Sequence, residues 1–108
     1  MAYLYLTLAI VSEVLGTLAL RAAATGRRVF YVGVAVGYVL SFFALIWTLR
    51  AGLALGVAYG VWAAAGVALT AIASRFLFAE PLTRRMLMGI VLIAAGVLAI
   101  ELGAAPTR

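Results

Sequence analysis

Glu13 is the only acidic residue inside the apolar run from Tyr3 to Leu20. A charged side chain near the centre of a lipid-buried helix costs at least about 2.5 kcal/mol, so such residues usually mark a proton or ion pathway. A carboxyl group in that position can exchange a proton as its surroundings change, and when ionised it attracts a cation. The simpler alternative is a protonated Glu13 that only hydrogen-bonds a neighbouring helix.

The apolar runs contain no basic residue, so a cation that pairs with Glu13 must come from outside the chain. Aromatic faces attract bulky, weakly hydrated cations. Tyr59 and Trp62 share one helical face, and each ring taken alone is equally compatible with packing. Trp47, at the end of its run, is typical of an interfacial belt. Taken with Glu13, the aromatic residues predict a site for a lipophilic cation, lined by Tyr3, Tyr38, Tyr59 and Trp62.

The composition excludes most enzymatic sites. The 108 residues are 69% hydrophobic and 10% charged, with no His, Cys, Lys, Asp, Asn or Gln. The chain therefore lacks the usual ligands of zinc or haem iron and any Ser-His-Asp or Cys-His arrangement. We expect no cofactor, no metal and no enzymatic activity. The net charge of +5 comes from arginines that flank apolar runs, as in membrane proteins, so we expect no nucleic-acid partner.

Four apolar runs are long enough to cross a bilayer, which takes about 20 helical residues. They cover residues 3–20, 29–49, 53–74 and 86–105, the last only if Glu101 lies at the far interface. Short connections make neighbouring helices antiparallel. The sequence thus predicts an all-α integral membrane protein, with a single domain of four transmembrane helices over residues 1–108.

Small residues indicate how the helices associate. Gly89 and Gly96 lie on one face of the fourth helix, and small residues allow the close backbone contact that drives helix pairing in lipid. We expect this face to contact a second copy, although packing within the protomer is also open. A chain of 108 residues is too thin to enclose a polar pathway alone, which favours a dimer.

Several motifs in combination resemble the small multidrug resistance family of proton-coupled exporters. The resemblance covers nearly the whole chain and rests on four segments. These are Glu13-Val14-Leu15-Gly16-Thr17 with Arg21 after it, Tyr38 with Ser41-Phe42, Gly56-Val57-Ala58-Tyr59-Gly60-Val61-Trp62, and Ala95-Gly96-Val97-Leu98.

The resemblance implies an antiparallel dimer of four-helix protomers in the inner membrane of a prokaryote. It implies that Glu13 is a carboxylate shared by protons and a lipophilic cation, and that Gly89 and Gly96 belong to the dimer interface. The further site residues that it implies are Trp62, Tyr59, Tyr3, Tyr38, Ser41, Thr17 and Gly16.

Gly16-Thr17 resembles the quaternary-ammonium, multidrug branch of the family, whereas the guanidinium-exporting branch has a Trp nearby. Within the family, a guanidinium-type or polyamine exporter and one subunit of a paired heterodimer stay open as alternatives. Outside transport, the alternative is an accessory structural membrane protein, which leaves Glu13 unexplained.

Three features depart from the family pattern. Ala64-Ala65-Gly66 replaces a Gly-x-Gly sequence, so one of two glycines that would let the third helix bend remains. Glu101 stands where a neutral polar residue is expected, and we interpret it as an interface group near the headgroups. The connection from Arg50 to Gly56 lacks a Pro.

The arginines are unevenly distributed between the two sides of the predicted bundle. Arginines near span ends favour the cytoplasmic side. We therefore expect both termini outside the cytoplasm in most copies, with a minority of inverted copies or an oppositely biased paralogue completing an antiparallel dimer. The side of the termini carries Arg50 and Arg108, and the other side carries Arg21, Arg27, Arg28, Arg75, Arg84 and Arg85.

Overall fold

The computed structural model describes residues 1–104, and that part of the chain consists of four α-helices without a strand. All four helices are long and apolar enough to cross a membrane, which confirms the predicted all-α class. The expected end of the last span at residue 105 and the contribution of Arg108 lie outside the described residues. The helices are α1 (Ala2–Ala24), α2 (Phe30–Arg50), α3 (Leu55–Leu77) and α4 (Arg84–Ala104).

Local sequence explains where the helices begin and end. Gly26 and Gly52 follow the last residues of α1 and α2 with φ angles of +114° and +107°, a conformation that glycine adopts at little steric cost. At the start of α4, the hydroxyl of Thr83 accepts a hydrogen bond from the Met86 N–H at 3.2 Å. Threonine is a favoured cap because its oxygen satisfies an N–H that the first turn leaves unpaired.

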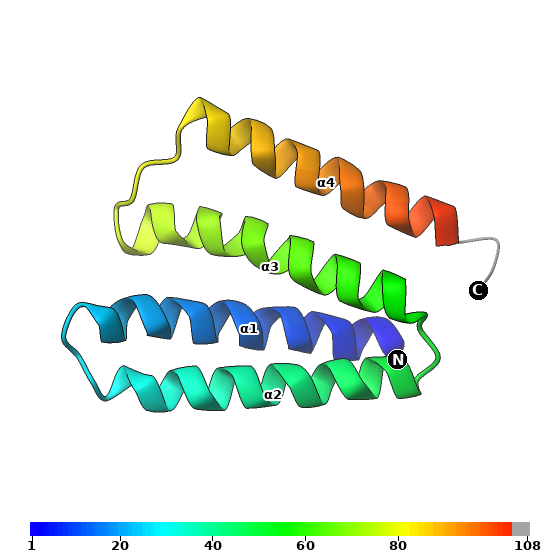
Figure 1. The fold of residues 1–108 in the computed structure, drawn as a ribbon, viewed down its shortest axis with the longest axis horizontal. Coiled ribbons are helices and arrows are strands. Elements are labelled where there is room, and N and C mark those ends of the chain that lie inside the picture. The colour runs from blue at the N-terminus through cyan, green and yellow to red at the C-terminus, as the bar shows by residue number, and fades with distance from the viewer. Residues whose placement is uncertain (105–108) are drawn as a thin grey trace.

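The helices alternate in direction along the chain. α1 and α3 run one way, and α2 and α4 run the other way (Figure 1). α3 lies between α1 and α4, and within residues 1–104 the backbone of α4 lies close to that of α3 alone. The N-terminus, the α2–α3 connection and the end of α4 therefore lie at one end of the bundle, and the other two connections lie at the opposite end.

α1 and α2 approach each other closely around two glycines. A Cβ atom on Gly37 would lie 2.8 Å from the Cα of Gly16, closer than real Cβ contacts. Ser41 and Thr48 are fully buried along the same helix as Gly37. Small and weakly polar residues allow this close packing in a membrane, where lipid gives no hydrophobic drive between helices.

The connection between α3 and α4 is tied back to the end of α1. The Arg21 guanidinium donates to a carboxylate oxygen of Glu80 at 3.0 Å, and it also lies over the ring of Phe78 at 5.3 Å from the centroid. Both charged side chains are more than two-fifths exposed, so this pair contributes little to stability. It does bring the connection into contact with the end of α1.

The helix α4 is the least covered part of the protomer, with no residue of its membrane-spanning window buried. A Cβ atom on Gly89 or Gly96 would have nothing within 4 Å. The described residues of the protomer thus leave this glycine face open, and its contact with a second copy stays a prediction.

Candidate functional site

Glu13 lies in the middle of α1 with its carboxyl group against α3. A Cβ atom built on Gly66 would collide with the Glu13 carboxyl oxygen and would lie 2.8 Å from its Cδ. Oε2 of Glu13 is buried and has no hydrogen-bond partner among the described residues. A buried carboxyl oxygen without a partner is energetically costly. A hydrogen-bond donor, a proton or a cation bound at Oε2 would offset this cost.

Gly66 is a residue whose contact with Glu13 sequence reasoning missed. We considered it only as the remaining glycine of a hinge, but in the structure it provides the space that the Glu13 carboxyl occupies. The spacing could have indicated a role for Gly66 at the site, since it lies four residues after Trp62 and therefore on the same helical face.

Trp62 is held by a hydrogen-bond chain that crosses three helices. Its indole N–H donates to the Ser41 hydroxyl at 2.9 Å, and this hydroxyl donates to the Ala9 carbonyl on α1 at 2.6 Å. Ser41 is completely buried. Buried polar networks that are fully paired hold their members rigidly, so Ser41 fixes the orientation of Trp62. The chain ends on α1 at Ala9, one helical turn before Glu13.

Three aromatic rings form a cluster around Trp62. Trp62 and Tyr59 are predicted site residues, and Phe42 is their neighbour on α2. Trp62 lies 5.6 Å from Tyr59 and 5.6 Å from Phe42, measured between ring centroids. Tyr59 is 56% exposed and Trp62 is half-buried, so this cluster reaches from the half-buried indole to the protein surface. The arrangement offers a continuous aromatic surface for a bulky cation.

Two other predicted site residues form a separate pair between α1 and α2. The hydroxyls of Thr17 and Tyr38 are 2.7 Å apart. A Cβ atom on Gly16 would lie 3.2 Å from the Tyr38 ring, so the glycine lets this ring pack closely against α1. Tyr38, Thr17 and Gly16 are thus brought together one turn beyond Glu13.

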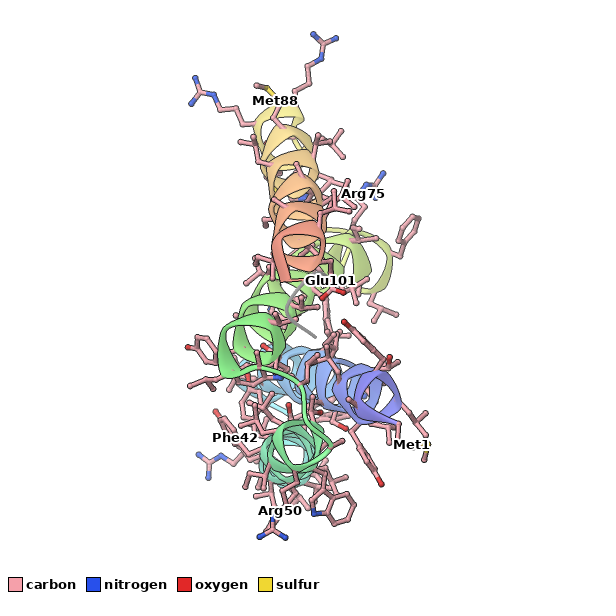
Figure 2. All side chains as sticks on the ribbon, turned by 90° about the vertical axis from the view of Figure 1, so that its right-hand side faces the viewer. Met1, Phe42, Arg50, Arg75, Met88 and Glu101 are labelled. Atoms are coloured by element: carbon pink, nitrogen blue, oxygen red, sulfur yellow. The ribbon has the colours of Figure 1, made fainter. Side chains whose placement is uncertain are left out.

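Tyr3 lies apart from the other predicted site residues. Its hydroxyl donates to Oε2 of Glu101 at 2.7 Å, which joins the start of α1 to the end of α4. Glu101, which we interpreted as an interface group, is thereby directed toward α1 (Figure 2). Sequence reasoning treated these two residues separately because they are almost a chain length apart.

No group of three or more His, Cys, Asp or Glu residues that could hold a metal occurs within the described part of the chain. The chemistry available at this site is that of the Glu13 carboxyl group, one oxygen of which is buried against Gly66, with the Trp62 ring one helical turn before Gly66 on α3. Such a site can bind a proton or a large organic cation.

Fold and site together define a four-helix membrane protein with a carboxyl group at mid-span. The chain belongs to the small multidrug resistance family, whose model matches residues 1–93.

Curated relatives cover nearly the full length of the chain. It is 40% identical over 101 residues to a multidrug transporter of Pseudomonas aeruginosa, covering 93% of this chain and 91% of that protein. It is 37% identical to the multidrug transporter EmrE of Escherichia coli, with the same coverage of both chains. It is 36% identical over 106 residues to the multidrug resistance protein EbrB of Bacillus atrophaeus, covering 97% and 90%. The family resemblance expected from the motifs is confirmed.

Replacing Trp62 with Leu tests whether its ring contributes to binding of an organic cation at this candidate site. We expect the affinity for tetraphenylphosphonium to weaken by about 0.5 to 2 kcal/mol, because an alkyl side chain lacks the negative face of an aromatic ring. Equilibrium binding of the radiolabelled cation to detergent-solubilised protein measures this. Trp62→Phe keeps a ring and should lose less, and Trp47→Leu should lose nothing, since Trp47 packs on Tyr5 away from Glu13. Unchanged affinity in Trp62→Leu would assign Trp62 to packing.

Proposed function

We propose that this protein is a proton-coupled antiporter that exports lipophilic and quaternary-ammonium cations through a membrane-embedded site centred on Glu13. The single observation that carries the proposal is the Glu13 carboxyl group, whose buried Oε2 lies against Gly66 without a hydrogen-bond partner among the described residues. The multidrug transporters among its relatives support this class of substrate.

The mechanism is exchange at one site. A proton and an organic cation compete for the Glu13 carboxylate, so binding of the cation requires release of the proton. If the site opens to one side of the membrane at a time, cation export is coupled to proton entry. The aromatic surface of Trp62 and Tyr59 holds the apolar body of the cation, while Thr17, Tyr38 and Ser41 orient the neighbouring helices.

The functional unit is a dimer in the inner membrane of a prokaryote. The open face of α4 around Gly89 and Gly96 supports this, because nothing in the described part of the protomer packs on it. In an antiparallel dimer, two Glu13 carboxylates face one chamber. The end of the bundle that carries the α1–α2 and α3–α4 connections has the excess of arginines. This excess favours one orientation of the chain in the membrane, so the partner is an inverted copy or an oppositely biased paralogue.

Cation binding with proton release distinguishes this transporter from an accessory structural protein. We expect solubilised protein to bind tetraphenylphosphonium and to release protons into a weakly buffered solution as it does so. The affinity should rise with pH, by up to about tenfold per pH unit for one exchanged proton, and level off once Glu13 is fully ionised. The sign follows from competition, since protons at low pH occupy the carboxylate that the cation needs. Absence of binding at every pH between about 5 and 9 would favour the accessory role.

A further inference from the structure

A pocket of about 530 Å³ lies at the end of the bundle that carries the α1–α2 and α3–α4 connections. It is lined by residues of α1, of the α1–α2 connection, of the start of α2 and of the end of α3. Figure 1 shows these segments meeting at one end of the molecule. Within the described part of the chain, neither Glu13 nor any residue of α4 lines this pocket. It is therefore separate from the Glu13 site and from the open glycine face of α4.

Most of the pocket wall is apolar. The apolar wall is formed by Leu15, Leu18 and Ala22 along α1 and by Leu77 and Phe78 at the end of α3. Leu15 and Ala22 are about 10 Å apart along the helix axis at a rise of about 1.5 Å per residue, so this wall extends from the end of α1 into its membrane-spanning part. Leu15 and Leu77 are 60% and 64% exposed. Because the surroundings of exposed apolar residues in a span are lipid, an occupant of the pocket comes from the lipid phase.

The end of the pocket formed by the α1–α2 connection carries a positive charge. Arg27 lines the pocket and is exposed. The glutamate at this end of the bundle, Glu80, is paired with Arg21, while Glu13 lies at mid-span and Glu101 near the opposite end. No carboxylate of the described residues therefore neutralises Arg27. A guanidinium group binds phosphate through two parallel N–H donors, and it repels an organic cation.

We propose that this pocket binds an anionic phospholipid, with an acyl chain along Leu15 and Leu77 and the phosphate group at the Arg27 guanidinium. Basic pockets between transmembrane helices are suited to anionic lipid headgroups. Six arginines and one glutamate lie at this end of the bundle, so its field favours a lipid with net negative charge over a zwitterionic one. The proposal does not depend on cation export, because Glu13 lies outside the pocket.

Native mass spectrometry of the full-length protein in a nonionic detergent tests the preference for an anionic lipid. Palmitoyl-oleoyl phosphatidylglycerol is compared with palmitoyl-oleoyl phosphatidylcholine, which has the same acyl chains and no net charge. Titration with each lipid gives the dissociation constant of the first bound lipid. We expect phosphatidylglycerol to bind the wild-type protein at least about fivefold more tightly, the factor that one arginine beside an anionic lipid supplies. Equal affinities for the two lipids would overturn the proposal.

Two neighbouring arginines separate a bound lipid from a general attraction to positive charge. Arg27→Gln and Arg28→Gln remove the same charge, but Arg28 does not line the pocket. We expect Arg27→Gln to reduce the preference for phosphatidylglycerol by about fivefold. Arg28→Gln should reduce it by less than about twofold, since water and salt screen a charge outside the pocket. Equal losses in the two variants would assign the preference to the diffuse charge of this end and would overturn the proposed site.

The apolar wall is tested by a second matched pair of variants. Ala22→Leu adds a larger side chain inside the pocket, whereas Ala24→Leu adds the same side chain at an exposed position of α1 outside it. We expect Ala22→Leu to weaken the binding of phosphatidylglycerol by at least about fivefold, because the acyl chain loses its space, and Ala24→Leu to leave it unchanged. Wild-type affinity in Ala22→Leu would show that the lipid binds elsewhere. If Ala22→Leu does not fold, the comparison of Arg27→Gln with Arg28→Gln still decides.

Inorganic phosphate distinguishes a lipid site from a site for the free ion. A large excess of phosphate should leave phosphatidylglycerol bound, since the ion makes none of the apolar contacts that the acyl chain gains in the pocket. Displacement of the lipid by phosphate at constant ionic strength would reassign the pocket to a phosphate ion and overturn the proposal.

Discussion

Glu13→Gln is expected to abolish cation binding and cation-induced proton release, with an affinity loss greater than about hundredfold, or about 2.7 kcal/mol. Glutamine has nearly the same shape as glutamate, so it fits against Gly66, but its amide carries no charge and exchanges no proton near neutral pH. The attraction between an ionised carboxylate and an organic cation is strong in the low-dielectric interior of a membrane protein. Binding of tetraphenylphosphonium and the accompanying pH change measure both losses.

Two further variants make this result specific to the Glu13 carboxyl group. Glu80→Gln removes an exposed carboxylate that pairs with Arg21 outside the site, and it should bind the cation with wild-type affinity. Glu13→Asp keeps a carboxyl group one methylene shorter, so it should retain proton release with a weaker affinity. Proton release that persists in Glu13→Gln would show that another group exchanges the proton.

Gly66→Ala is expected to weaken cation binding by about tenfold to hundredfold, the scale on which small displacements of a reacting group matter. The added Cβ atom would collide with the Glu13 carboxyl oxygen. Because that oxygen is the far end of a flexible side chain, we expect the carboxyl group to move and the helix packing to survive. Alanine is also a better helix former than glycine, so α3 itself should not be destabilised.

The matched control for this substitution is Gly56→Ala in the same helix. A Cβ atom on Gly56 would meet nothing within 4 Å, so this variant should bind with wild-type affinity. Measuring equilibrium binding instead of transport separates the steric effect on Glu13 from any effect on helix bending. Wild-type affinity in Gly66→Ala would mean that the Glu13 carboxyl does not need its position against α3.

Hydropathy made the four helices predictable. Backbone groups in lipid must pair within their own segment, so an apolar run of about 20 residues forms a helix whatever its neighbours do. The same reasoning made Glu13 conspicuous, since a carboxyl group in such a run is costly wherever the helix packs. The aromatic candidates Trp62 and Tyr59 followed because their spacing places both rings on one helical face.

The sequence therefore determined the helices and their alternating directions, and it singled out Glu13 as the candidate for the centre of the site. Only the tertiary structure decided the rotation and register of each helix, and with them the contact of Glu13 with Gly66, the Trp62–Ser41–Ala9 chain and the Tyr3–Glu101 bond. The physical reason is that nearly every residue of these helices is apolar, so hydrophobicity does not specify which side faces which neighbour. Close contacts between small residues such as Gly16 and Gly37 determine the facing sides instead. These contacts depend on the shapes of both helix surfaces.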